Sequence, residues 1–139
     1  MTAAATRLYT PEMLGLATGL ARYPLDRAMP FQGKARSPSC GSSLEMSLAL
    51  DPAERIERLG LLTQACAIGQ ASAALFAAGA VGIGRTQLVT VLAEIEAWLG
   101  GGPLPEWPGL AAIAPARAFP GRHGAILLPW RAALDALPS

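Results

Sequence analysis

Metal-binding and charged side chains are scarce in this sequence, which has two cysteines and a single histidine among 139 residues. Asp, Glu, Lys and Arg together make up 15% of the chain and leave a net charge of only +1. A nucleic-acid-binding surface needs clustered Lys and Arg side chains to neutralise phosphates, and few such clusters occur here. The composition therefore excludes nucleic acid from the expected partners.

A hydrolase is also weakly supported. Ser, His and Asp all occur, but the sequence has no nucleophile elbow. No carboxylate can be identified that would orient His123 for proton transfer. We therefore expect a protein that is not an enzyme.

The apolar stretch 59–84 is about as long as a membrane-spanning helix. It is made mainly of Ala and Gly and contains Thr63, Gln64, Gln70 and Ser72, so its insertion into a bilayer would be unfavourable. A buried helix of small residues explains the stretch better. We expect no membrane partner.

The N-terminal residues 1–7 are not followed by the apolar region of a signal peptide. Two cysteines in such a chain suggest a reducing compartment, and we expect a cytoplasmic location. A disulfide between Cys40 and Cys66 is the alternative if the protein is secreted.

Hydrophobic periodicity predicts one α+β domain over residues 1–139. Residues 44–50 alternate between apolar and polar, a turn follows at 51–54, and 56–64 forms the return strand of a hairpin. Helices are expected after Thr10, at 67–78, from about Thr86 to 99, and at the C-terminus with a kink at Pro129. The proline-containing segment 25–39 is interpreted as an extended loop, and Trp107, between prolines, as partly exposed.

Cys66 lies where the strand pattern changes to a helical one, close to a helix N-terminus. Unpaired backbone N–H groups and the helix dipole favour a thiolate at such a position, and a thiolate is both a nucleophile and a metal ligand. Cys40 lies in a turn-forming loop just before the hairpin. If the two strands pair, the loop before one strand and the corner after the other meet at one end of the sheet.

These segments resemble, in their order along the chain, the iron–sulfur cluster scaffold family of the NifU N-terminal, IscU and SufU type. The resemblance covers about residues 8–137. It rests on Ser37-Pro38-Ser39-Cys40-Gly41, the hairpin with Ile56 and Leu61, Ala65-Cys66-Ala67-Ile68-Gly69-Gln70-Ala71-Ser72-Ala73, and Arg122 with Trp130.

The resemblance implies an α+β fold with a small three-stranded antiparallel sheet packed with helices. It implies that thiolates receive sulfur from a cysteine desulfurase and hold iron or a labile [2Fe–2S] cluster for transfer to acceptor proteins. Cys40 and Cys66 take the positions of the first two cysteine ligands of that family.

The sequence departs from the family at three other positions. Ser42 occupies the place of an aspartate, Ala125 that of the third cysteine, and Gly124 that of a histidine found in many members. His123 is displaced by one residue, which rotates a side chain by about 100° on a helix. An unactivated serine hydroxyl is neutral near pH 7 and is therefore a poor substitute for the carboxylate.

Two ways of completing the ligand set follow. A monomer could recruit His123 as third metal ligand beside Cys40 and Cys66, or a homodimer could supply both cysteines twice and give the four thiolates of a [2Fe–2S] cluster. Two other functions remain open. The chain could be an interaction or regulatory module of a cysteine desulfurase without cluster binding, or a zinc-binding protein that relays sulfur.

Overall fold

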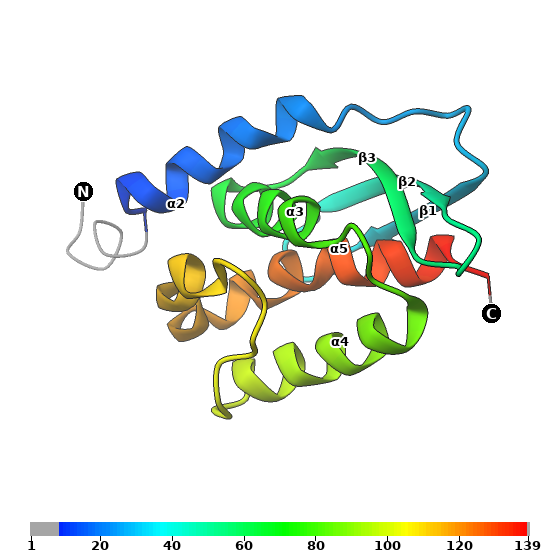
Figure 1. The fold of residues 1–139 in the computed structure, drawn as a ribbon. Helices are drawn as coiled ribbons and strands as arrows, with labels where there is room; N and C mark the ends of the chain where they lie inside the picture. Colours follow the sequence, from blue (N-terminus) through cyan, green and yellow to red (C-terminus); the bar gives the residue numbers. More distant parts are fainter. Residues whose placement is uncertain (1–8, 139) are drawn as a thin grey trace.

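The computed structural model describes residues 9–138, which fold as α+β with the sheet and helices packed around one core (Figure 1). Residues 1–8 and Ser139 lie outside the described residues, and these include the N-terminal residues 1–7 that were considered as a signal peptide. The elements, in chain order, are α2 (Pro11–Leu16), η1 (Ala17–Arg22), β1 (Phe31–Arg36), β2 (Ser43–Leu50), β3 (Ile56–Gln64), α3 (Ala67–Gly79), α4 (Arg85–Leu99), η2 (Leu110–Ala118), η3 (Pro120–Arg122) and α5 (His123–Ala136).

The sheet has three antiparallel strands in the order β1-β2-β3. The predicted hairpin of β2 and β3 is confirmed, with Ser43 opposite Gln64 at one end and Leu50 opposite Ile56 at the other. The expectation of a small three-stranded antiparallel sheet with helices is confirmed as well.

Strand β1 corrects the interpretation of 25–39 as a loop. Its inward-facing positions are Phe31, Gly33 and Ala35, and two of these three side chains are too small to mark a strand in a hydropathy pattern. The small residue at Gly33 is needed because α5 passes directly over it. A Cβ added there would lie 2.7 Å from the Ala136 Cβ.

Each edge strand of the sheet has one backbone N–H that bonds to another part of the chain. On the β1 side, the Asp135 carboxylate accepts a hydrogen bond from the backbone N–H of Lys34 at 2.9 Å. On the β3 side, the backbone N–H of Leu61 donates to the Tyr23 carbonyl at 2.8 Å. The chain itself therefore satisfies one backbone N–H on each side of the sheet.

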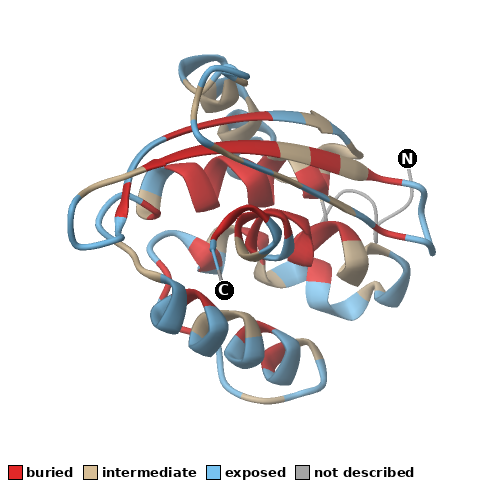
Figure 2. Ribbon diagram, turned by 90° about the vertical axis from the view of Figure 1, so that its right-hand side faces the viewer, coloured by how far each residue is buried: buried red, intermediate tan, exposed pale blue. Residues whose placement is uncertain are grey.

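Helices α3 and α5 enclose the core against the sheet (Figure 2). The small side chains of α3 let the helices approach closely, and the Ser72 hydroxyl donates to the Ile126 carbonyl at 2.6 Å in the buried contact. Burial of the large apolar side chains stabilises the fold by about 1.5–3 kcal/mol each. The fully buried ones include Met13, Leu44, Met46, Leu48, Ile56, Ile68, Phe76, Leu88, Ile95, Leu110, Ile113 and Trp130.

Three aromatic rings from distant segments meet within this core. Phe76 stacks on Trp107 with ring centroids 5.6 Å apart, and Trp130 meets Trp107 edge-on at 5.3 Å. The expectation that Trp107 is partly exposed was wrong. The indole is 6% exposed and its N–H donates to the Leu75 carbonyl at 2.8 Å.

The helix boundaries follow the prediction with two corrections. The Thr10 side chain caps α2, as expected, but the chain continues after Leu16 as the 3-10 helix η1. Helix α4 begins at Arg85 with Gly84 as its N-cap, so Thr86 lies inside the helix. No helix among residues 9–138 combines the length and apolar character required to cross a bilayer.

Candidate functional site

Cys40 is presented on a tight turn between β1 and β2. The turn is closed by two backbone hydrogen bonds, from Ser37 N–H to the Ser42 carbonyl at 2.8 Å and from Gly41 N–H to the Ser37 carbonyl at 2.9 Å. Gly41 has a φ of 72°, a conformation that glycine adopts without steric cost. The turn leaves the Cys40 side chain exposed.

Hydroxyl groups surround the Cys40 sulfur. The Sγ atom lies 3.1 Å from the Ser42 Oγ, and the Ser37 hydroxyl also hydrogen-bonds to the thiol. These hydrogen bonds, with a smaller contribution from the positive charge of Arg122, lower the pKa of Cys40 because they favour the thiolate. The exposed thiol is thus prepared for nucleophilic or ligand chemistry.

Cys66 is the N-cap residue of α3, as its position between strand and helix patterns predicted. Its backbone is extended, with φ −64° and ψ 172°, and its carbonyl accepts the Gln70 N–H at 3.0 Å in the first turn. The side chain is half-buried, and both cysteines are free thiols.

The sheet register brings the two cysteine-bearing segments to one end of the molecule. Ser43 pairs with Gln64, so Cys40 lies three residues before this pair and Cys66 two residues after it. The pairing of β2 with β3 that predicted this arrangement is the one observed.

The start of α5 contacts both segments. Gly124 lies against Ser37, so a Cβ at Gly124 would overlap the Ser37 hydroxyl and lie 3.0 Å from the Ser37 Cβ. The next residue, Ala125, is fully buried and packs near Gly69 in the first turn of α3. The two positions where the resembling family carries histidine and cysteine are thus next to the cysteine segments but have no donor atom and little free space.

His123 hydrogen-bonds to η2 through one ring nitrogen. Its Nε2 lies 2.7 Å from the Arg117 carbonyl in η2. Within residues 9–138, no group of three or more His, Cys, Asp or Glu side chains is placed to hold a metal ion. The structure therefore brings the Cys40 and Cys66 segments to one end without adding His123 to a joint ligand set.

An open groove of about 600 Å³ gives access to Cys40. Its far wall is the segment from Ala118 to Arg122. The Arg122 guanidinium donates to the Tyr9 hydroxyl at 3.4 Å and forms no ion pair with a carboxylate among the described side chains. The groove combines a thiol and an unneutralised positive charge.

Ser37 was not identified as a site residue from the sequence. Its hydroxyl bonds to the Cys40 thiol and lies 3.1 Å from the Ser39 Oγ. A serine three residues before a cysteine in a turn-forming segment is the signal that could have identified it.

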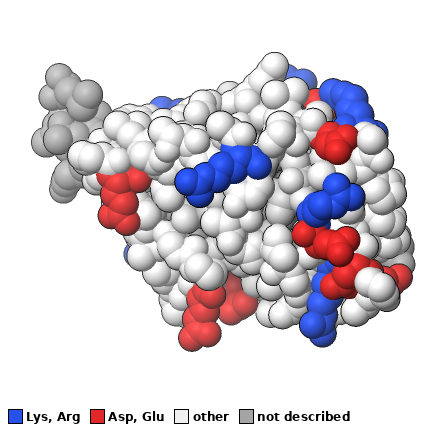
Figure 3. All heavy atoms as spheres, turned by 45° about the horizontal axis from the view of Figure 1, so that its top comes forward, with Lys and Arg blue, Asp and Glu red and all other residues white. Residues whose placement is uncertain are grey.

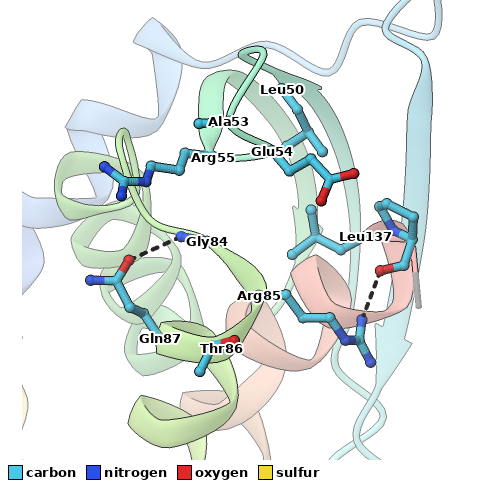
Figure 4. Close-up of a pocket in the computed structure, with 10 residues that line it drawn as sticks. Leu50, Ala53, Glu54, Arg55, Gly84, Arg85, Thr86, Gln87 and Leu137 are labelled. Carbon is cyan, nitrogen blue, oxygen red and sulfur yellow. Dashed lines mark hydrogen bonds between the residues drawn. The ribbon is translucent and has the colours of Figure 1, made fainter.

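A second cavity, of about 540 Å³, lies at the opposite end of the sheet (Figure 4). Arg85 and Gln87 line it, but both side chains already bond to the chain. Arg85 donates to the carbonyls of Leu134 and Pro138, and the Gln87 Oε1 accepts the Gly84 N–H at 3.1 Å. Arg85 therefore links α4 to the C-terminal residues, and Gln87 stabilises the start of α4.

The charged side chains are dispersed on the face that Figure 3 shows. Basic and acidic groups lie interspersed, separated by uncharged surface. One exposed pair, Arg27 with Glu45 at 3.2 Å, joins charges of opposite sign. This face has no continuous basic surface for a polyanion.

Comparison with solved structures finds proteins that share this fold. A NifU-like protein (N-terminal) from Brucella abortus matches with a TM-score of 0.86 and 23% identity over 96% of this chain and 94% of its own. A protein described as an iron–sulfur cluster assembly scaffold for the SUF system from Fervidobacterium islandicum matches with a TM-score of 0.83 and 19% identity over 95% and 98%. No protein-family model and no curated protein sequence matches the chain.

Proposed function

We propose that this chain acts in iron–sulfur cluster assembly as a scaffold-type carrier in a reducing, cytoplasmic compartment, and not as an enzyme. Cys40 and Cys66 are the thiolates that hold iron or a labile [2Fe–2S] cluster as cargo for acceptor proteins. The observation that supports this most directly is the position of the two cysteine segments at one sheet end, on either side of the start of α5. The fold shared with scaffold proteins supports it as well.

The number of ligands favours a homodimer for the loaded state. A [2Fe–2S] cluster is held by four thiolates, and one chain supplies two. Among residues 9–138, His123 does not lie in a group of three or more potential metal ligands with Cys40 and Cys66. Two chains that meet at their cysteine ends would provide Cys40 and Cys66 twice and would not need His123 as a ligand.

Cys40 is the better placed thiol to receive sulfur, because it is exposed and its hydrogen bonds to Ser37 and Ser42 lower its pKa. In this proposal the thiolate attacks the outer sulfur of a cysteine persulfide on the desulfurase. A new S–S bond forms on Cys40, and the desulfurase cysteine leaves as a thiolate. The groove along Ala118 to Arg122 provides the approach.

Anaerobic reconstitution tests the proposal. Wild-type protein incubated with ferric iron and sulfide should gain visible charge-transfer absorption and elute as a dimer, and Cys66→Ser should gain none. Identical spectra for the two proteins would refute cluster binding. Metal analysis of protein purified without added metal separates this function from a zinc-binding sulfur relay.

The contact between Gly124 and Ser37 favours a second candidate function, a cysteine desulfurase module that binds no cluster. In this case Gly124 and Ala125, at the positions where the resembling family carries histidine and cysteine, supply no ligand, and only the protein-binding surface is kept. A pull-down that recovers desulfurase equally well with wild type and with a Cys40→Ser/Cys66→Ser double variant, when neither gains cluster absorption, would favour this candidate.

A further inference from the structure

The outer face of the sheet, on the side away from α5, is only partly covered by the rest of the chain. One row across the three strands consists of Gln32, Ser47 and Gly60. The segment 24–29 closes over this row. The Ser47 hydroxyl accepts the Asp26 N–H at 3.1 Å, and the Gln32 side chain donates to the Asp26 carbonyl at 3.1 Å. Ser47 is therefore fully buried on the outer face.

The next two rows, toward the end of the sheet that carries the cysteines, are left open. The first is Lys34, Glu45 and Leu62, and the second is Arg36, Ser43 and Gln64. All six residues line one hollow of about 430 Å³, together with Ala35 and Leu44. We call these two rows the open sheet face. It lies next to the Cys40 turn, because Arg36 is the last residue of β1 before that turn.

The positive charges of the open sheet face have no partner within the chain. Glu45 is the carboxylate in this hollow, and Arg27 pairs with it at 3.2 Å. Lys34 and Arg36 form no ion pair with a carboxylate of residues 9–138, a range that contains all ten Asp and Glu residues of the sequence. The hollow therefore carries two uncompensated positive charges.

The open sheet face also exposes an apolar side chain. Leu62 lines the same hollow and is 49% exposed. The solvated face of an antiparallel sheet usually carries polar side chains, so a leucine here is unusual. An exposed apolar side chain gives a protein partner an anchor, and unpaired cations attract its acidic groups. Nucleic acid fits less well, because its phosphates call for many Lys and Arg side chains.

We propose that the open sheet face binds an acidic segment of a partner protein, which places an apolar side chain on Leu62 and carboxylates at Lys34 and Arg36. Binding there needs neither cysteine and is independent of cluster binding. A partner held on this face would lie next to the Cys40 turn, where the proposed function places the exchange of sulfur.

Selection from a random peptide library displayed on phage tests the proposal, with the whole chain, reduced and metal-free, as bait. We expect the enriched peptides to combine Asp or Glu with a bulky apolar residue. Fluorescence anisotropy of labelled synthetic copies should show binding that weakens about tenfold between about 0.05 M and 0.5 M salt. Enrichment of neutral or basic peptides, or of none, would overturn the proposal.

Single substitutions locate the binding surface. Arg36→Glu and Leu62→Ser should each weaken peptide binding about fivefold or more. Arg58→Glu is the matched charge control, since Arg58 is exposed on β3 outside this hollow, and Val81→Ser is the apolar control, at a side chain that is 62% exposed. Both controls should bind as wild type does. Equal losses in Arg36→Glu and Arg58→Glu, or none in Arg36→Glu and Leu62→Ser, would overturn the proposal.

Two other occupants of the open sheet face are outcomes that would also overturn it. Self-association of the metal-free chain that is lost in Arg36→Glu, measured by sedimentation, would assign the face to a second copy. Tighter binding of a single-stranded oligonucleotide than of the peptide, with the same loss in Arg36→Glu, would assign it to nucleic acid. Because these assays contain no iron or sulfide, their failure would leave the cluster reconstitution result unaffected.

Discussion

Gly124, at the start of α5, lies so close to Ser37 that the two residues exclude any side chain between the Cys40 turn and the helix. A Cβ on Gly124 would overlap the Ser37 hydroxyl and lie 3.0 Å from the Ser37 Cβ. The turn cannot yield easily, because backbone hydrogen bonds join Ser37 to Ser42 and Gly41.

We therefore expect Gly124→Ala to lower the free energy of unfolding by about 1–3 kcal/mol, the usual cost of overpacking. Gly121→Ala is the matched control, since no atom lies within 4 Å of a Cβ at that position. Urea unfolding measures both. In a Ser37→Gly background the cost of Gly124→Ala should fall, and an unchanged cost would show that this contact is not its cause.

The hydroxyls around Cys40 predict a pH effect on its reactivity. They lower the pKa of Cys40 by stabilising the thiolate, so Ser37→Ala and Ser42→Ala should each raise it. At a pH below the pKa of a free thiol, fewer variant molecules than wild-type molecules would carry a thiolate, and alkylation would be slower. The measurement is the iodoacetamide rate against pH in a Cys66→Ser background. Rate profiles that do not move toward higher pH in either variant would contradict the prediction.

Trp107 predicts a stability effect far from the cysteines. Its indole N–H donates to the Leu75 carbonyl and its ring stacks on Phe76. Trp107→Phe should remove the hydrogen bond and part of the packing, lowering the free energy of unfolding by about 1–3 kcal/mol. Leu104→Ala, at a side chain that is 41% exposed in the same proline-containing segment, should change it by less than about 0.5 kcal/mol.

At Gly33, β1 and α5 pack so closely that no side chain can be placed between them. In Gly33→Ala the new Cβ would meet the backbone of α5 at Ala132 and Ala136, which cannot rotate away. We expect a loss of about 1–3 kcal/mol in urea unfolding. Gly15→Ala, on the open side of α2, should instead be neutral or slightly stabilising. Equal effects of the two substitutions would contradict the packing argument.

Periodicity in the sequence was sufficient for the hairpin and for α3, because Leu44, Met46 and Leu48 alternate cleanly and the apolar helix begins directly after Cys66. It was insufficient for β1, where glycine and alanine face inward. The hydropathy pattern reports only the polarity of each residue. The need for a small residue at Gly33 arises from its contact with α5, about 100 residues later in the chain.

The candidate site was likewise predictable where it depends on local sequence patterns and not where it depends on distant contacts. The positions of Cys40 and Cys66 followed from strand pairing, which is a property of the hairpin. The direction of the His123 ring did not, because it depends on the Arg117 carbonyl, whose place is set by the 3-10 helix η2. The burial of Trp107 was not predicted for a similar reason. Its ring packs against Gly79, where a Cβ would lie 2.9 Å from the indole, and this contact cannot be read from the local sequence.

The hydrogen bond from Lys34 to Asp135 has a consequence for how copies of this protein can associate. Strand-by-strand growth from one molecule into the next requires free amide groups along a sheet margin, and here Asp135 and Tyr23 each take one such group. Polymerisation through β1 or β3 would first have to break these intramolecular bonds. The two bonds therefore oppose edge-to-edge strand pairing at Lys34 and at Leu61.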